Sequence, residues 1–185
     1  SADTLSRMND IQTHRGPDDS GLFIEQGIGM AHRRLSIIDI ASGHQPLFSQ
    51  DQSVVIVFNG EIYNFQDIRK QLLAKGYKFN THSDTEVIVC AWQEWKQHCV
   101  DYLRGMFAFA IWDKKEKQIF LARDRYGIKP LYYTFVNDKF LFASEIKAFL
   151  ACPSFSVEMD HEALLEYMTF QNLFTDRTLF KNVTV

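Results

Sequence analysis

The sequence has 185 residues, of which 46% are hydrophobic and 14% aromatic, so length and composition predict a globular chain with a sizeable buried core. The formal net charge of −3 and the isoelectric point near 6.0 give no reason to expect nucleic acid or an anionic membrane as a partner. No apolar run approaches the roughly 18 residues of a membrane span, and the opening SADTLSRMND lacks the basic and apolar regions of a secretion signal.

The first part of the chain predicts a helix, a strand pair and a buried strand. Residues 3–12 have a helical pattern, and the runs 21–25 and 29–39 have the pattern of two paired strands. Apolar residues fill every position of 54–58 (VVIVF), which indicates a strand that is covered on both faces.

Start and stop signals predict three more helices. After Asn64, apolar residues keep to one helical face until Gly76, which suits the position after a helix C-cap. Ser83 and Glu86 have the spacing of a capping box before the apolar run VIVCAW, and Asp160 is a candidate N-cap for HEALLEYM. The apolar face of the first of these helices consists of Phe65, Ile68, Leu72 and Leu73.

Two further strand pairs follow. Residues 106–113 and 118–124 are joined by KKEK, and residues 131–136 and 139–144 are joined by Asn-Asp. Connections this short join antiparallel neighbours, because a parallel crossover needs a dozen residues or more. Grouped antiparallel strands with grouped helices predict an α+β fold in one domain, with helices stacked on the sheet faces.

The cysteines and histidines give no sign of a disulfide framework or a metal site. The three cysteines, at positions 90, 99 and 152, are odd in number and show no C-x-x-C spacing, and no two histidines are spaced as H-x-x-x-H. We therefore expect no metal and a reducing cytoplasm as the compartment.

Asn59, Gly60 and Glu61 follow the buried strand and allow two interpretations. Asn-Gly is the preferred pair of a two-residue hairpin turn. The chain, however, continues through a short EIY link into a helix and not into a partner strand. A glycine lets a backbone N–H approach a ligand closely, and the Asn59 amide is a second donor beside it, so the pair could hold a developing oxyanion.

Arg34 and Asp84 also allow two interpretations each. Strand alternation puts His32 and Arg34 on one face of an apolar strand, where a guanidinium pairs with a carboxylate of a neighbour or of a ligand. Asp84 lies in the first turn of a helix, where the helix dipole favours an acid without any function. Together with Glu61 and the paired donors, these side chains complement an α-amino acid whose side chain ends in an amide.

Seven motifs, in order, carry a resemblance to a known family. They are HRGPD (14–18), HRRLSIID (32–39), FNGEIYN (58–64), SDTEVI (83–88), GMFAFAIWD (105–113), RDRYGIKPLYY (123–133) and SEIKA (144–148). Over essentially its whole length the chain resembles the N-terminal glutaminase domain of glutamine-hydrolysing asparagine synthetases, within the class II glutamine amidotransferases.

The resemblance implies the N-terminal-nucleophile hydrolase fold, a four-layer αββα sandwich of two antiparallel sheets. It implies that the domain binds L-glutamine and, in the intact protein, hydrolyses it to glutamate and ammonia for ATP-dependent amidation of aspartate. Arg34 would grip the α-carboxylate, Glu61 and Asp84 would receive the α-ammonium, and Asn59 with the Gly60 N–H would form the oxyanion hole. The RLSII backbone would line the pocket through Arg34, Leu35, Ser36, Ile37 and Ile38.

The sequence departs from the family pattern at its start. The family nucleophile is an N-terminal cysteine whose own α-amino group is the base. Here only thirteen residues, beginning with Ser1, precede His14. We therefore expect a domain of residues 1–185 that lacks its first strand and its nucleophile and is inactive as it stands. The gap in the sheet leads us to expect an exposed apolar groove, with poor stability or a homodimer as the result.

The resemblance also implies partners and alternatives. The domain itself needs no cofactor, whereas ATP and Mg²⁺ belong to a synthetase domain that we expect to follow residue 185 and to be its partner. Two other functions stay open: a related amidotransferase with a different carboxylate acceptor, or a glutamine-binding or scaffold domain that has lost its nucleophile.

Overall fold

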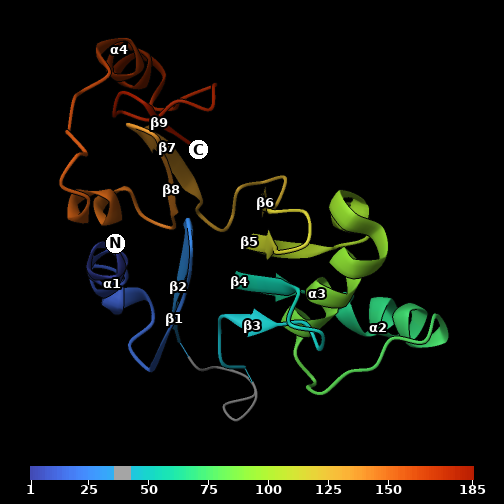
Figure 1. The fold of residues 1–185 in the computed structure, drawn as a ribbon. Helices are drawn as coiled ribbons and strands as arrows, with labels where there is room; N and C mark the ends of the chain where they lie inside the picture. The colour runs from blue at the N-terminus through green and yellow to red at the C-terminus, as the bar shows by residue number, and fades with distance from the viewer. Residues whose placement is uncertain (36–42) are drawn as a thin grey trace. The chain divides into compact units, whose positions relative to one another are not determined.

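The computed structural model describes residues 1–35 and 43–185, and its contacts divide the chain into two compact units (Figure 1). One unit holds Thr13–Lys129, and the other combines Asp3–Gln12 with Pro130–Val185. Each unit has a hydrophobic cluster of its own. The expectation of a single domain stays a prediction.

The Thr13–Lys129 unit contains two antiparallel sheets within its described residues. A hairpin pairs β1 (Asp19–Glu25) with β2 (Ile28–Arg34), and a second sheet has the strand order β3-β4-β5-β6. These four strands are β3 (Leu47–Phe48), β4 (Val54–Ile62), β5 (Gly105–Asp113) and β6 (Gln118–Arg123). The helical elements are η1 (Thr13–Arg15), α2 (Phe65–Ala74), α3 (Asp84–Trp95) and η2 (Lys96–Asp101).

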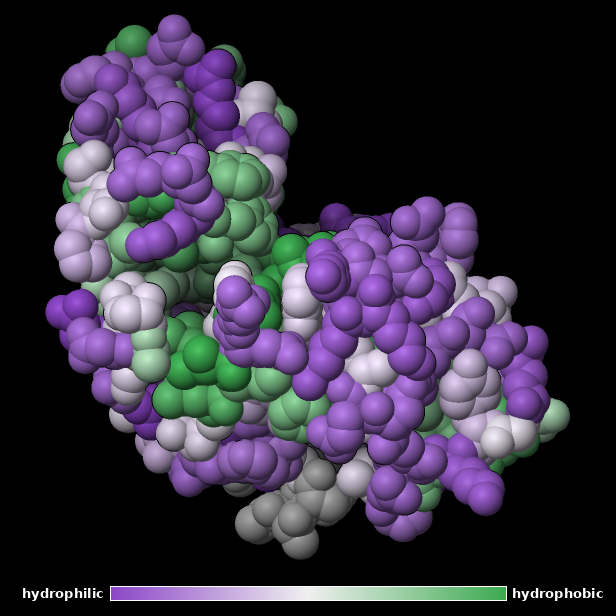
Figure 2. All heavy atoms as spheres, viewed as in Figure 1, coloured by the Kyte–Doolittle hydropathy of each residue, from purple (hydrophilic) through white to green (hydrophobic). Residues whose placement is uncertain are grey.

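Helices α2 and α3 cover one face of the four-stranded sheet (Figure 1). Every residue of α3 from 85 to 92 is buried, which makes this helix the centre of the core. Ile68 and Leu72 of α2 are buried as predicted, but Leu73 is 50% exposed and does not belong to the buried face. Figure 2 shows mainly hydrophilic residues over the part of the molecule that contains α2, as expected for a helix that buries only one side.

Strand β4 is longer than the sequence predicts. It runs without interruption through Asn59 and Gly60 to Ile62, in antiparallel register with β5, where Gly60 lies opposite Phe107. The hairpin-turn interpretation of Asn59-Gly60 is therefore wrong. The link into α2 is reduced to the two residues Tyr63 and Asn64.

The helix signals are confirmed with one exception. Gly76 has a φ of +93°, and the N–H of Tyr77 donates to the Leu72 carbonyl at 3.1 Å, which closes the end of α2. Ser83 Oγ accepts from the Glu86 N–H at 3.3 Å, as a capping box requires. The Glu86 carboxylate does not return to Ser83, however. It accepts from the backbone N–H groups of the preceding loop, at 2.8 and 2.7 Å.

The second unit is built on the sheet β8-β7-β9. Its elements are α1 (Ala2–Asp10), β7 (Tyr132–Val136), β8 (Lys139–Ala143), η3 (Ile146–Ala151), α4 (His161–Phe170) and β9 (Val183–Thr184). Met8 of α1 packs with Phe149 and Val183 in its core. Asp160 caps α4 as predicted, since its side chain accepts from the N–H groups of Glu162 and Ala163.

All three predicted strand pairs form antiparallel hairpins, β1–β2, β5–β6 and β7–β8, so the α+β class is confirmed. Across residues 1–35 and 43–185, no helix is both long and apolar enough to cross a membrane.

Candidate active site at the open edge of strand β4

Alternate residues of β4 turn their backbone groups away from β5. Ile56 pairs with Leu47 of β3 on this edge. Two residues further along, the Phe58 N–H donates to Gln45 Oε1 at 2.6 Å, and the Phe58 carbonyl accepts from Gln45 Nε2 at 3.1 Å. At the end of the strand, the Ile62 N–H donates to Asp84 Oδ2 at 3.0 Å. Three of the edge positions are therefore occupied by protein groups.

Gly60 lies between the occupied positions. By strand alternation its N–H and C=O point to the same edge as those of Phe58 and Ile62. Phe107, which lies opposite Gly60, confirms this alternation. Its N–H and its C=O both form hydrogen bonds with Asp124, on the edge of β5 that faces away from β4. Among the described residues outside β5, none hydrogen-bonds to the Gly60 backbone. Within residues 1–35 and 43–185, this edge therefore has one backbone position without a partner, which we call the open position.

Glycine is required at position 60 by both space and backbone. Its φ is +150°, and a Cβ there would lie 2.2 Å from the Met106 carbonyl oxygen and 2.7 Å from Phe107 Cα. No real side chain tolerates such distances, so β5 can approach β4 this closely only at a glycine.

Two carboxylates lie beside the open position. Asp84 is the first residue of α3 and reaches the Ile62 N–H, and Glu61 is the exposed neighbour of Gly60. Burial raises the pKa of Asp84 above its ordinary value, and the negative charge of Glu61 raises it further, while the hydrogen bond from Ile62 lowers it. The two acids are therefore close enough to interact and form one anionic corner.

Arg34 is linked to this edge through His32. The ring of His32, on β2, contacts the Phe58 carbonyl through Nε2 at 3.0 Å. Burial lowers the pKa of His32 to about 4, the hydrogen bond to Phe58 opposes this, and the nearby Arg34 charge lowers the pKa further. The Asp18 N–H donates to the Arg34 carbonyl at 3.1 Å. Arg34 thus belongs to a strand that is fastened to β4 next to the open position.

The structure brings Gly60, Glu61 and Asp84 together at one edge and ties the strand of Arg34 to it, while Asn59 precedes Gly60 in β4 and lies opposite Ala108. Leu35, the next residue of the expected pocket, is 53% exposed. Ser36, Ile37 and Ile38 lie outside the described residues.

Sequence reasoning missed Gln45 and Asp124. Gln45 meets Phe58 over thirteen residues of sequence and carries no local signal. The sequence predicts Asp124 only as the last residue of the strand 118–124. It accepts from four backbone N–H groups at 3.1 Å each, those of Phe107, Tyr126, Ile128 and Lys129.

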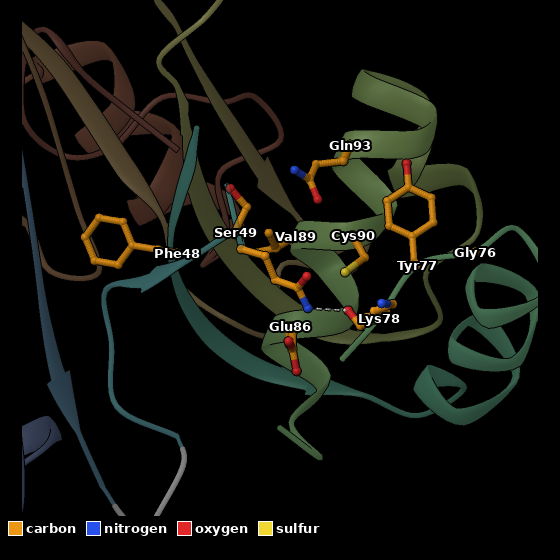
Figure 3. Close-up of a pocket in the computed structure, with 10 residues that line it drawn as sticks. Phe48, Ser49, Gly76, Tyr77, Lys78, Glu86, Val89, Cys90 and Gln93 are labelled. Atoms are coloured by element: carbon orange, nitrogen blue, oxygen red, sulfur yellow. Dashed lines mark hydrogen bonds between the residues drawn. The ribbon is translucent and has the colours of Figure 1, made fainter. Parts of the chain in front are cut away.

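A separate cavity of about 360 Å³ lies beside α3, between β3 and the segment after α2 (Figure 3). None of the candidate site residues lines it. Its carboxylate, Glu86, already accepts from the preceding loop, and the Gln50 side chain donates to the Lys78 carbonyl across it at 3.0 Å. This cavity is therefore not part of the β4 site.

The three cysteines are buried, and none contributes to the β4 site. Burial raises the pKa of Cys90 to about 12 and that of Cys99 to about 12, so both thiols stay protonated near neutral pH. In the part of the chain that the structure describes, no three His, Cys, Asp or Glu residues are grouped to hold a metal ion.

Comparison with known proteins gives the class of the chain. The family model described as "Glutamine amidotransferase domain" matches residues 1–185. The chain therefore belongs to the glutamine amidotransferase family, and the resemblance found in its sequence is confirmed.

Curated relatives show which members of the family the chain resembles. The chain is 49% identical over 167 residues to asparagine synthetase [glutamine-hydrolyzing] 1 of Bacillus subtilis, covering 90% of this chain and 26% of the relative. It is 45% identical over 150 residues to amidase chyE of Penicillium rubens, covering 80% and 22%. The chain thus matches the glutaminase domain of asparagine synthetases, and it spans about a quarter of the length of these relatives.

Solved structures support the fold. Glutamine phosphoribosylpyrophosphate amidotransferase of B. subtilis superposes with a TM-score of 0.61 at 24% identity, covering 85% of this chain and 42% of that one. An allosteric regulatory enzyme of purine biosynthesis superposes with a TM-score of 0.56 at 28% identity, covering 66% and 29%. The expected amidotransferase fold with antiparallel sheets is therefore confirmed.

Proposed function

We propose that this chain is the glutaminase domain of a glutamine-hydrolysing asparagine synthetase and that it binds L-glutamine at the β4 edge. The observation that carries the proposal is the open backbone position at Gly60, between Phe58 and Ile62, with two carboxylates beside it.

The chemistry of the edge matches the two ends of glutamine. Glu61 and Asp84 receive the α-ammonium, and Arg34 pairs with the α-carboxylate. The Gly60 N–H and the Asn59 side-chain amide receive the carboxamide oxygen, which becomes an oxyanion when the carbonyl is attacked. The resemblance implies that the backbone of residues 35–38 would line the rest of the pocket, and residues 36–38 lie outside the described residues. The anionic corner and the oxyanion donors are adjacent because one end of the substrate is a cation and the other becomes an anion.

Hydrolysis needs a thiolate and a base of pKa near 8, which the α-amino group of an N-terminal cysteine supplies. The cysteines of this sequence are internal and buried, and so they do not supply them. We place the nucleophile on a cysteine outside the 185 residues. Ammonia released in the intact protein would then amidate aspartate in a synthetase domain that uses ATP and Mg²⁺.

Calorimetric titration of the chain with L-glutamine tests the site. We expect binding to the wild type and a loss of roughly tenfold or more in affinity for Asp84→Asn and for Glu61→Gln, because each removes a charge-assisted contact. Asp67→Asn removes a carboxylate on the exposed side of α2 and should leave the affinity unchanged. Wild-type affinity in both site variants would refute the assignment.

An ammonia assay tests the missing nucleophile. We expect the 185-residue chain, with its N-terminus verified by intact mass, to release no ammonia from L-glutamine. Release that persists in a Cys90→Ser, Cys99→Ser and Cys152→Ser triple variant would show that another group of this chain performs the attack.

The similarity to amidase chyE favours a second candidate, a related amidotransferase that passes ammonia to a different carboxylate. Product analysis of the longer protein with ATP, ammonia and a panel of carboxylic acids separates the two. Aspartate as the best acceptor supports the asparagine synthetase assignment. A third possibility, a glutamine-binding or scaffold domain, requires that the gene contains no cysteine codon upstream of Ser1.

A further inference from the structure

The Phe58 backbone is paired with a side chain where a neighbouring strand would be expected. The carboxamide of Gln45 accepts from the Phe58 N–H at 2.6 Å and donates to the Phe58 carbonyl at 3.1 Å. A peptide group offers the same two functions, one donor and one acceptor. Gln45 is only 7% exposed, so these bonds are shielded from water.

The pairing register shows what Gln45 replaces. Phe48 lies opposite Val55 and Leu47 opposite Ile56, so a continued ladder would bring residue 45 opposite Phe58 and residue 43 opposite Gly60. Strand β3 instead ends at Leu47, and the side chain of Gln45 occupies the place of its backbone. Because the ladder stops there, Gly43 does not close the edge at Gly60.

Two further contacts surround the pair of Gln45 and Phe58. His32 Nε2 contacts the same Phe58 carbonyl at 3.0 Å, and the neutral ring donates to it. The backbone of Gly21 packs on Gln45 so closely that a Cβ on this glycine would lie 1.9 Å from the Gln45 carbonyl oxygen. The Phe58 carbonyl therefore accepts from both Gln45 and His32, and the backbone of Gln45 is packed tightly against β1.

We propose that Gln45 is a positioning residue for the glutamine site: by ending the β3–β4 ladder with its side chain, it keeps the Gly60 backbone open and correctly oriented for the ligand. The proposal rests on the proposed function. Glutamine suits the role because Glu lacks the donor, Met lacks both groups, and Asn is one methylene shorter.

The test compares Gln45→Met with a matched control. Asn64 also binds backbone with both ends of a carboxamide, donating to the Tyr102 carbonyl and accepting from the Arg104 N–H at 2.9 Å each. Asn64→Ala thus removes the same kind of contact away from Gly60. We expect Q45M to weaken L-glutamine binding by about tenfold or more and N64A to change it less than about twofold.

A readout on the ligand-free protein separates positioning from general stability. In Q45M we expect faster hydrogen exchange at the Phe58 amide and a shifted Gly60 amide resonance, and in N64A an unchanged Gly60 resonance. Gln45→Glu, which keeps the acceptor for the Phe58 N–H, replaces Q45M if the latter does not fold. It should restore slow Phe58 exchange but not glutamine affinity.

Failure of the two proposals can be told apart. If the wild-type chain binds no L-glutamine, the proposed function fails, and the ligand-free Gly60 resonance still decides whether Gln45 positions the edge. A folded Gln45 variant with wild-type glutamine affinity, or with an unchanged Gly60 resonance, overturns the positioning role.

Discussion

At the scale of single residues, the missing side chain of Gly60 matters both for packing against β5 and for binding through the backbone. The carbonyl of Met106 and Cα of Phe107 fill the space of its missing side chain on one side. On the other side, between Phe58 and Ile62, no described residue pairs with its backbone. The same absence of a side chain therefore allows the close packing of β5 and the exposure of a backbone donor.

Gly60→Ala should lower the free energy of unfolding by about 2–4 kcal/mol, because the new Cβ collides with backbone and the backbone conformation is strained. Gly27→Ala is the control, since Gly27 has a φ of +85° but no atom within 4 Å of its Cβ position. We expect that variant to lose about 1 kcal/mol. Equal losses in denaturant titrations of the two variants would show that packing against β5 is unimportant.

His32 gives the stability a pH dependence. Burial lowers its pKa to about 4 from its ordinary value of 6.5, so between these values only the unfolded chain takes up the proton. Its contribution to stability is complete above pH 6.5 and falls as the pH drops toward 4, by up to about 3 kcal/mol. When the free energy of unfolding is measured across this pH range, it should depend less steeply on pH in His32→Gln than in the wild type. His98→Gln changes an exposed histidine and is the control substitution.

At the scale of elements, Asp124 continues the pairing of β5 where β6 ends. Its N–H donates to the Phe107 carbonyl at 2.8 Å, and its carboxylate accepts from the Phe107 N–H. The Arg123 guanidinium donates to the carbonyls of Gly127 and Lys129 at 2.7 Å each. The turn after β6 is therefore bonded to Phe107, the residue of β5 that lies opposite Gly60.

Asp124→Asn should lower the free energy of unfolding by about 2–5 kcal/mol. Each carboxylate oxygen of Asp124 accepts from two backbone N–H groups, so an amide in either orientation leaves two donors facing an NH₂ group. The Phe107 amide should also exchange faster with solvent. Asp101→Asn, at an exposed position in the same unit, is the control and should stay within about 0.5 kcal/mol of the wild type.

The hairpins and helix ends are predictable from sequence because their causes are local. KKEK between two apolar runs, Gly76 after an amphipathic run and Asp160 before another each specify a structure within a few residues. The length of β4 is not predictable in this way. Asn-Gly favours a turn locally, and only the pairing of Gly60 with Phe107, far along the chain, keeps the strand straight.

At the scale of the whole molecule, the chain folds as two compact units with separate cores. All three tryptophans, Trp92, Trp95 and Trp112, belong to the Thr13–Lys129 unit. The core of the other unit is centred on Phe149, which is fully buried and packs on Phe155 with ring centroids 5.6 Å apart. Fluorescence and hydrogen exchange can therefore follow the two units separately.

Phe149→Ala should destabilise its own unit by about 3–5 kcal/mol, because it leaves a cavity in a small core. We expect faster amide exchange in β7 and β8, with little change in β4 and β5 or in tryptophan fluorescence. Leu150→Ala changes the next residue, which is 56% exposed, and should leave exchange as in the wild type. Uniformly faster exchange in all four strands would show that the two units unfold together.

Some residues of the candidate site are predictable from the local sequence, and others are placed there only by tertiary contacts. Asn59, Gly60 and Glu61 are neighbours in sequence, and Asp84 follows the N-cap Ser83 at the start of a helix, so these four can be proposed from the sequence. Gln45 and His32 meet Phe58 only through tertiary contacts over thirteen and twenty-six residues. Motif spacing carries no information about such contacts.

The burial of every thiol makes the molecule convenient for site-directed labelling. With Cys90 at 6%, Cys99 at 0% and Cys152 at 3% exposure, maleimide dyes should leave the native protein unmodified. Asp67→Cys and Asp138→Cys would then place one reactive handle on each unit, without first having to remove the natural cysteines. Energy transfer between the two dyes would report whether the distance between the two units changes when glutamine is added.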